Sequence, residues 1–69
     1  MQTLIQAQQA YIDQVNRCVR PRDRASRVRR AAGRKLRAYL EKIGVTGELA
    51  HQIVRDAWDM AELENNSED

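Results

Sequence analysis

The sequence predicts an all-α protein built from three helices. Apolar residues recur every three or four positions in each of three consecutive segments. Thr, Pro and Gly stand where these segments begin or end. Strict apolar–polar alternation, which marks a half-buried strand, is missing from the sequence. We therefore expect a small three-helix bundle or helical hairpin, with helices at about residues 4–19, 21–43 and 47–63.

The first expected helix covers residues 4–19. Thr3 and Gln6 have the spacing of a capping box, in which each side chain binds the other residue's backbone. A residue before proline is disfavoured in the α conformation, so Arg20, which precedes Pro21, should lie outside the helix. The apolar stripe of this helix consists of Leu4, Ile5, Tyr11, Ile12, Val15, Cys18 and Val19.

The second expected helix covers residues 21–43. Pro21 suits the first helical position, and Gly44 is a suitable C-terminal cap. Gly33 costs about 1 kcal/mol relative to Ala in a helix interior, so it indicates either close packing or a break. The sequence also allows the first two helices to be separate or one kinked helix. The predicted inner face consists of Ala25, Val28, Ala32, Leu36, Tyr39, Leu40 and Ile43.

The third expected helix covers residues 47–63, within one domain of residues 1–64. Residues 65–69 are polar and acidic, and we expect a flexible tail there. A chain of 69 residues builds a thin core, and its single cysteine, Cys18, cannot form an internal disulfide. We therefore expect a homodimer joined through the first or third helix. The predicted inner face consists of Leu49, Ala50, Ile53, Val54, Ala57, Met60 and Ala61.

Charge is distributed very unevenly along the chain. Residues 17–42 hold eleven of the twelve Lys and Arg residues, against only Asp23 and Glu41. Residues 43–69 hold seven acidic residues against Arg55. The modest net charge of +2 therefore hides a strongly basic middle segment. Such a segment indicates an anionic partner.

Four arginines of the basic segment share one side of the second helix, because they are spaced three or four residues apart. Guanidinium groups bind phosphate oxygens in pairs, which favours nucleic acid as the partner. Exposed aromatic residues are scarce, so a duplex is favoured over a single strand, and DNA and RNA both remain open. The four, called the arginine stripe below, are Arg27, Arg30, Arg34 and Arg37. The full set of expected nucleic-acid contacts adds Arg22, Arg24 and Lys35, with Arg29 beside them.

Other interpretations of the same features are possible. The basic helix could form salt bridges with the acidic third helix of the same or a neighbouring subunit. The protein could instead be an adaptor or inhibitor that docks on an acidic partner, with Trp58 as an anchor between Val54 and Ala61. A helix-turn-helix interpretation is disfavoured because the would-be recognition helix, 48–64, carries five acidic residues.

Catalysis, metal binding and membrane insertion receive little support from the sequence. His51 is the only histidine and has no nucleophile near it along the chain. One Cys and one His cannot complete a tetrahedral zinc site. We expect no cofactor and no enzymatic activity. A free cysteine and the lack of a long apolar run favour a cytoplasmic location.

Overall fold

The computed structural model describes residues 2–66, which form helices and connecting turns without any strand. Helix α1 spans Leu4–Arg17. Helix α2 (Pro21–Asp23), the π-helical turn η1 (Arg24–Val28) and helix α3 (Arg29–Lys42) follow one another without a break, as one rod. Helix α4 spans Gly47–Asn66. This compact three-helix arrangement confirms the predicted fold class.

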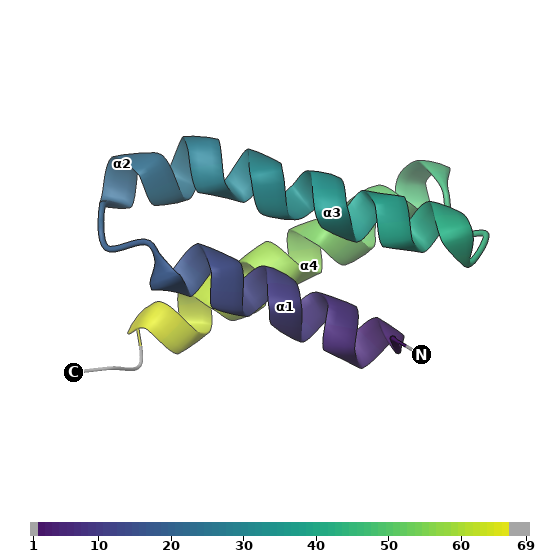
Figure 1. Cartoon of the computed structure of the whole chain (residues 1–69), viewed down its shortest axis with the longest axis horizontal. Helices are drawn as coiled ribbons and strands as arrows, with labels where there is room; N and C mark the ends of the chain where they lie inside the picture. Colours follow the sequence, from purple (N-terminus) through teal and green to yellow (C-terminus); the bar gives the residue numbers. More distant parts are fainter. Residues whose placement is uncertain (1, 67–69) are drawn as a thin grey trace.

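The three long helices form a bundle, because each of α1, α3 and α4 contacts the other two. Helix α1 and the α2–η1–α3 rod run antiparallel, and α4 crosses behind them (Figure 1). The chain reverses direction after α1 and again after α3. A bundle is therefore correct, and an extended hairpin is not.

Helix α1 begins as expected and ends two residues early. The Gln6 N–H donates to Thr3 Oγ1 at 3.2 Å, and the Thr3 N–H donates to Gln6 Oε1 at 3.0 Å, which confirms the capping box. The helix ends at Arg17, and Arg20 is extended (φ −92°, ψ 113°), as a residue before proline should be. The first two helices are therefore separate. Val19, expected in the apolar stripe, lies in this turn and is 92% exposed.

The rod ends in a Schellman motif at Gly44. Gly44 has φ +82°, a left-handed conformation that favours glycine. The Val45 N–H donates to the Leu40 carbonyl at 2.8 Å, and the Gly44 N–H donates to the Glu41 carbonyl at 3.1 Å. These bonds satisfy carbonyls that the helix end leaves unpaired. The predicted role of Gly44 is confirmed.

Gly33 does not interrupt α3. It is buried where the rod approaches α1 and α4. A Cβ atom placed on Gly33 would lie 3.7 Å from Val54 Cγ1 and 4.0 Å from Tyr11 Cε2, which is ordinary van der Waals contact. Gly33 is therefore not a break, and its buried position faces side chains of α4 and α1 with space for a Cβ atom.

The hydrophobic core is thin and rich in alanine, which lets the three helices approach closely. Several expected inner residues lie at its edge instead: Ile5, Ile43, Leu49 and Met60 are 47–77% exposed. Each helix meets only two neighbours, so the margins of its apolar stripe remain uncovered. The buried apolar residues are Ala7, Tyr11, Ile12, Val15, Ala32, Leu36, Leu40, Ala50, Ala57 and Ala61.

The π-helical turn η1 changes which residues of the rod face inward. The Arg29 N–H donates to the Arg24 carbonyl, five residues back, so this turn is wider than an α-helical turn. Inner residues of an α-helix that recur every four positions drift around the axis, because one turn holds 3.6 residues. The wide turn reduces this drift between Arg24 and Val28, so Arg24 stays on the same inner face as Val28. That face consists of Arg24, Val28, Ala32, Leu36 and Leu40, whereas Ala25, predicted to be inside, is exposed.

Helix α4 extends to Asn66, past the expected end at residue 63. Asn65 and Asn66 of the expected tail are therefore helical, and residues 67–69 lie outside the described residues. Within residues 2–66, no helix is long and apolar enough to cross a membrane.

Candidate anion-binding groove

A groove with a volume of about 790 Å³ separates the η1–α3 rod from α4. Its walls come from these two elements and its floor from α1. Five arginines and one histidine line it, and none of the lining residues is acidic. We call it the arginine groove. Its lining residues are Tyr11, Ala25, Ser26, Arg29, Arg30, Gly33, Arg34, Arg37, His51, Val54 and Arg55.

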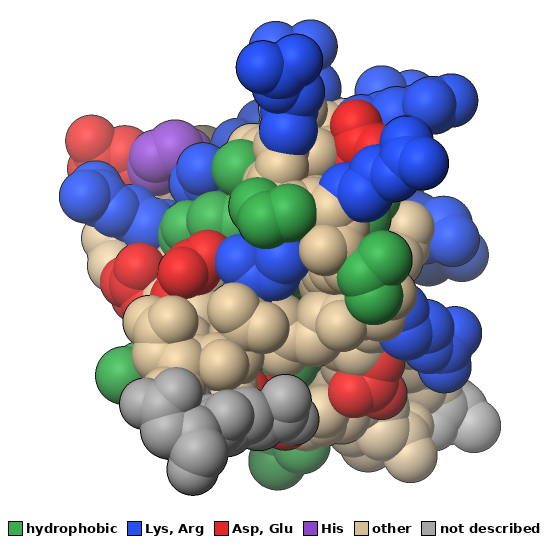
Figure 2. Space-filling view, turned by 90° about the vertical axis from the view of Figure 1, so that its left-hand side faces the viewer, with side chains coloured by type: hydrophobic (Ala, Val, Ile, Leu, Met, Phe, Trp, Pro, Cys, Tyr) green, Lys and Arg blue, Asp and Glu red, His purple; other side chains and the backbone are tan. Residues whose placement is uncertain are grey.

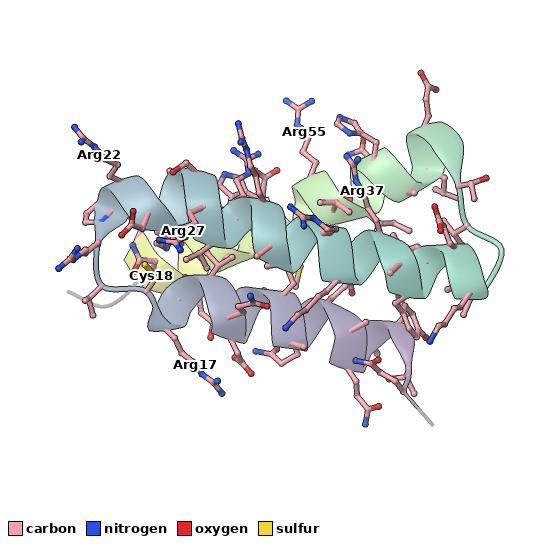
Figure 3. All side chains as sticks on the ribbon, turned by 45° about the horizontal axis from the view of Figure 1, so that its top comes forward. Arg17, Cys18, Arg22, Arg27, Arg37 and Arg55 are labelled. Atoms are coloured by element: carbon pink, nitrogen blue, oxygen red, sulfur yellow. The ribbon has the colours of Figure 1, made fainter. Side chains whose placement is uncertain are left out.

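The two walls of the arginine groove carry positive charge on both sides. Figure 3 shows Arg37 of α3 and Arg55 of α4 on the same side of the molecule, whereas Arg17 of α1 points away from it. The Arg37 Nη2 atom lies 3.3 Å from His51 Nδ1. Because a guanidinium can only donate, the histidine nitrogen accepts this hydrogen bond. This contact ties the arginine stripe to α4.

The floor of the groove holds a buried hydroxyl group. Tyr11 is 2% exposed, and its hydroxyl hydrogen has no acceptor within the described residues. Burial raises the pKa of Tyr11, while the positive charge of Arg29, a hydrogen bond from Arg29 to the hydroxyl oxygen and the positive charge of Arg24 act in the opposite direction. The hydroxyl is therefore protonated at neutral pH and can donate a hydrogen bond.

Arg24, predicted as a nucleic-acid contact, is buried instead. It is 8% exposed and forms the single ion pair found among the described residues, with Glu62. Its Nη2 atom also donates to Asn16 Oδ1 at 2.8 Å and to the Ala61 carbonyl at 3.3 Å. The π-helical turn rotates this side chain inward, where it joins η1 to α1 and α4. Its guanidinium is not available to a partner on the surface.

The other predicted contacts are exposed and lie on two sides of the rod. Arg30, Arg34 and Arg37 line the groove, while Arg27 and the flanking residues Arg22 and Lys35 lie outside it. The view onto the end of the bundle shows Lys and Arg side chains at the top, on the right and on the upper left (Figure 2). The basic surface is therefore broader than a single stripe.

The predicted protein-docking residues do not form an exposed patch. Ala61 is completely buried, and Val54 is partly buried at the groove. Trp58 is also partly buried, with the guanidinium carbons of Arg29 and Arg24 at 4.2 and 5.1 Å from its ring centroid. Positive charges at these distances attract the face of an aromatic ring.

Acidic α4 does not neutralise the arginine stripe within the described part of the chain. The Arg24–Glu62 pair is the one salt bridge found there. Asp56 on α4 instead accepts a hydrogen bond from Gln52 at 3.0 Å. The same-subunit salt-bridge interpretation is therefore correct for Arg24 but not for the four arginines of the stripe.

Sequence reasoning missed three contributors to the groove: Tyr11, His51 and Arg55. Tyr11 was assigned to the core, which is correct for its ring but omits its hydroxyl. Arg55 could have been noticed as the one basic residue after residue 42. Periodicity within single helices could not have shown that these residues meet the stripe.

The described residues contain no group of three or more His, Cys, Asp or Glu side chains that could hold a metal ion. Comparison with known proteins finds no matching family model, no similar curated protein and no similar solved structure. The fold and the site thus define a small three-helix protein with an arginine-lined groove.

Proposed function

We propose that this protein binds duplex nucleic acid by contacting its phosphates. The contacts are the arginine stripe, assisted by Arg22 and Lys35. The observation that carries the proposal is that all four stripe arginines are exposed and form no ion pair within the described residues. Neighbouring positive charges on one helix repel each other, and phosphate groups would relieve that repulsion.

Recognition of the backbone is favoured over recognition of base sequence. Apart from arginine, the basic surface offers few of the side chains that discriminate bases, such as Asn and Gln. An aromatic stacking platform for single strands is also lacking, because Tyr11 is buried and both Tyr39 and Trp58 are partly buried. A duplex, bound through its phosphates and its shape, therefore fits this surface best.

The test is a titration of labelled duplex DNA, duplex RNA and single strands over a series of salt concentrations. The test variant replaces Arg27, Arg30 and Arg34 with Ala and retains Arg37, because Arg37 contacts His51. The matched control replaces Arg17, Arg20 and Lys42 with Ala. Both variants lower the net charge from +2 to −1.

We expect the wild-type protein to bind a duplex with an affinity that falls steeply with salt. The stripe variant should lose affinity for every sequence and lower the salt slope by about one unit per lost contact. The control should retain most of the wild-type affinity and most of the wild-type salt slope. Equal losses in the two variants would show that net charge alone matters, and the proposed surface would then be wrong. Loss of discrimination at one base pair would contradict backbone recognition.

We also propose that the protein acts as a homodimer. The core is small, half of its buried apolar residues are alanines, and Leu63 and Met60 of α4 are 70% and 48% exposed. Burying such side chains against a second subunit would add apolar contact that the monomer lacks. Light scattering after size-exclusion chromatography should give twice the mass of the chain. A monomer at all accessible concentrations would contradict this expectation.

A further inference from the structure

We propose that the arginine groove is a distinct binding site for a small ligand that carries two or more phosphate groups, with the Tyr11 hydroxyl as a hydrogen-bond donor at its floor. This proposal goes beyond nucleic-acid binding, because it needs no duplex. It assigns a role to three residues that the arginine stripe does not include: Tyr11, Arg29 and Arg55.

The first argument concerns the Tyr11 hydroxyl. Tyr11 is almost completely buried, and its ring packs near Gly33 on the groove floor. Tyr11 and Arg29 both line the groove, and the hydroxyl of Tyr11 lies beside the Arg29 guanidinium. A guanidinium cannot accept a hydrogen bond, so Arg29 cannot satisfy the phenol hydrogen. The hydroxyl oxygen is covered in the unbound protein, so a phosphate oxygen could accept this hydrogen bond once the Arg29 side chain moves towards the anion.

The cost of this arrangement also indicates a ligand. A buried donor without an acceptor is unfavourable, and phenylalanine would fill the same place without that cost. A hydroxyl that weakens the unbound protein is readily explained if it contributes to binding.

The second argument compares the groove arginines with Arg24 on the same rod. The two terminal nitrogens of the Arg24 guanidinium have Glu62, Asn16 Oδ1 and the Ala61 carbonyl as partners inside the protein, and only its Nε lacks one within the described residues. The five groove arginines have no carboxylate among the residues that line the groove. The protein therefore neutralises the arginine that it buries and leaves the groove arginines for an external anion.

The third argument is the size and shape of the site. A volume of about 790 Å³ falls in the range of roughly 300–1,000 Å³ that is typical of small-molecule pockets. A single phosphate group would leave most of this space empty. Arg55 and His51 on one wall face Arg30, Arg34 and Arg37 on the other. Donors on opposite walls suit a ligand whose phosphates can contact both.

The experiment is calorimetric titration with inorganic pyrophosphate and adenosine triphosphate as probes, and with inorganic phosphate for comparison. The test variant is Tyr11→Phe, which removes one oxygen atom. The matched control is Tyr39→Phe, which removes a hydroxyl that binds the Gln2 carbonyl at 3.0 Å and does not line the groove. Thermal unfolding of each protein is measured with and without pyrophosphate.

We expect wild-type protein to bind pyrophosphate more tightly than phosphate. A hydrogen bond to a charged group is worth enough that Tyr11→Phe should weaken pyrophosphate binding about tenfold. Tyr39→Phe should change it less than about twofold, because its hydroxyl lies outside the groove. Without ligand, Tyr11→Phe should unfold at the same or a higher temperature than wild type. Pyrophosphate should raise the unfolding temperature of wild type more than that of the variant.

A second variant tests the groove independently in case Tyr11→Phe folds poorly. Arg55 is exposed on the far wall, so Arg55→Gln should fold normally and still weaken pyrophosphate binding several-fold. The control, Arg17→Gln, should leave pyrophosphate binding unchanged. The proposal would be overturned if wild type does not bind pyrophosphate, or if Tyr11→Phe and Arg55→Gln both bind it as strongly as wild type does.

The two proposals can fail separately. Tyr11-dependent pyrophosphate binding without any duplex binding would support the groove site and remove the nucleic-acid function. Duplex binding without pyrophosphate binding would overturn the groove site and retain the proposed function. If both ligands bind and pyrophosphate displaces the duplex, the groove also receives backbone phosphates, which supports the groove site.

Discussion

The guanidinium carbon of Arg29 lies 4.2 Å from the centroid of the Trp58 ring, and that of Arg24 lies 5.1 Å from it. Arg24 belongs to the interior ion pair with Glu62, and Arg29 belongs to the arginine groove. Trp58 therefore lies where the buried polar cluster meets the arginine groove. Its ring is partly covered by arginine side chains, so it is poorly presented as an anchor for another protein.

This position makes Trp58 a reporter of the groove. It is the only tryptophan in the chain, so its fluorescence can be assigned without ambiguity. An anion that draws Arg29 into the groove should weaken the cation–π contact and change the emission of Trp58. We expect pyrophosphate to shift the emission spectrum in wild type and in Arg17→Ala, but much less in Arg29→Ala. An undiminished response in Arg29→Ala would show that Arg29 does not couple the two sites.

Arg24 should stabilise the fold rather than bind a partner. Replacement by Ala leaves Glu62 without its cation and the Ala61 carbonyl without this donor, which should cost about 3 kcal/mol of unfolding free energy. Arg24→Met should cost clearly less, because an apolar chain of similar length fills the space. Urea unfolding measures both, with the exposed Arg27→Ala as a control expected to change stability by less than about 0.5 kcal/mol. Equal stability of Arg24→Ala and Arg27→Ala would refute the interior role.

Gly33 and Gly44 should respond to alanine in opposite ways. Gly33 is helical and has space for a Cβ atom at 3.7 Å from Val54 Cγ1, so Gly33→Ala should stabilise the protein by about 0.5–1 kcal/mol. Gly44 has φ +82°, so Gly44→Ala should destabilise it by about 1 kcal/mol. Thermal or urea unfolding checks both. Destabilisation by Gly33→Ala would mean that the helices pack more closely there than these distances indicate.

Alkaline pH should weaken the fold partly through Tyr11. Burial raises the pKa of Tyr11 above its ordinary value of 10.0, so the unfolded chain loses this proton at lower pH than the folded one. The contribution of Tyr11 to stability is therefore complete below about pH 10 and declines as the pH rises through its folded pKa. Urea unfolding from pH 8 to 11 should show a smaller decline in Tyr11→Phe than in Tyr39→Phe. Parallel declines would contradict this assignment.

Local signals explain why the helix ends could be predicted from the sequence. The Thr3–Gln6 capping box, the extended residue before Pro21 and the left-handed Gly44 each depend on residues within one or two turns of the chain. The end of α1 was placed two residues too late because Cys18 and Val19 extend the apolar pattern although the turn has already begun.

The location of positive charge was also evident from the sequence, since residues 17–42 hold eleven of the twelve Lys and Arg residues. The position of Arg24 was not. A single π-helical turn places Arg24 in the interior and Ala25 on the surface, the reverse of the prediction. No residue type in its sequence, RASRV at residues 24–28, predicts such a turn.

The composition and helical periodicity thus determined an all-α chain with one strongly basic helix. Only the tertiary structure decided that this helix would form one wall of a groove, with Tyr11 at the floor and Arg55 on the opposite wall. The physical reason is that helix periodicity fixes directions around one axis, whereas a groove depends on how neighbouring helices cross. That crossing is set by close packing of small residues such as Ala32, Ala57 and Gly33, which the pattern of a single helix does not specify.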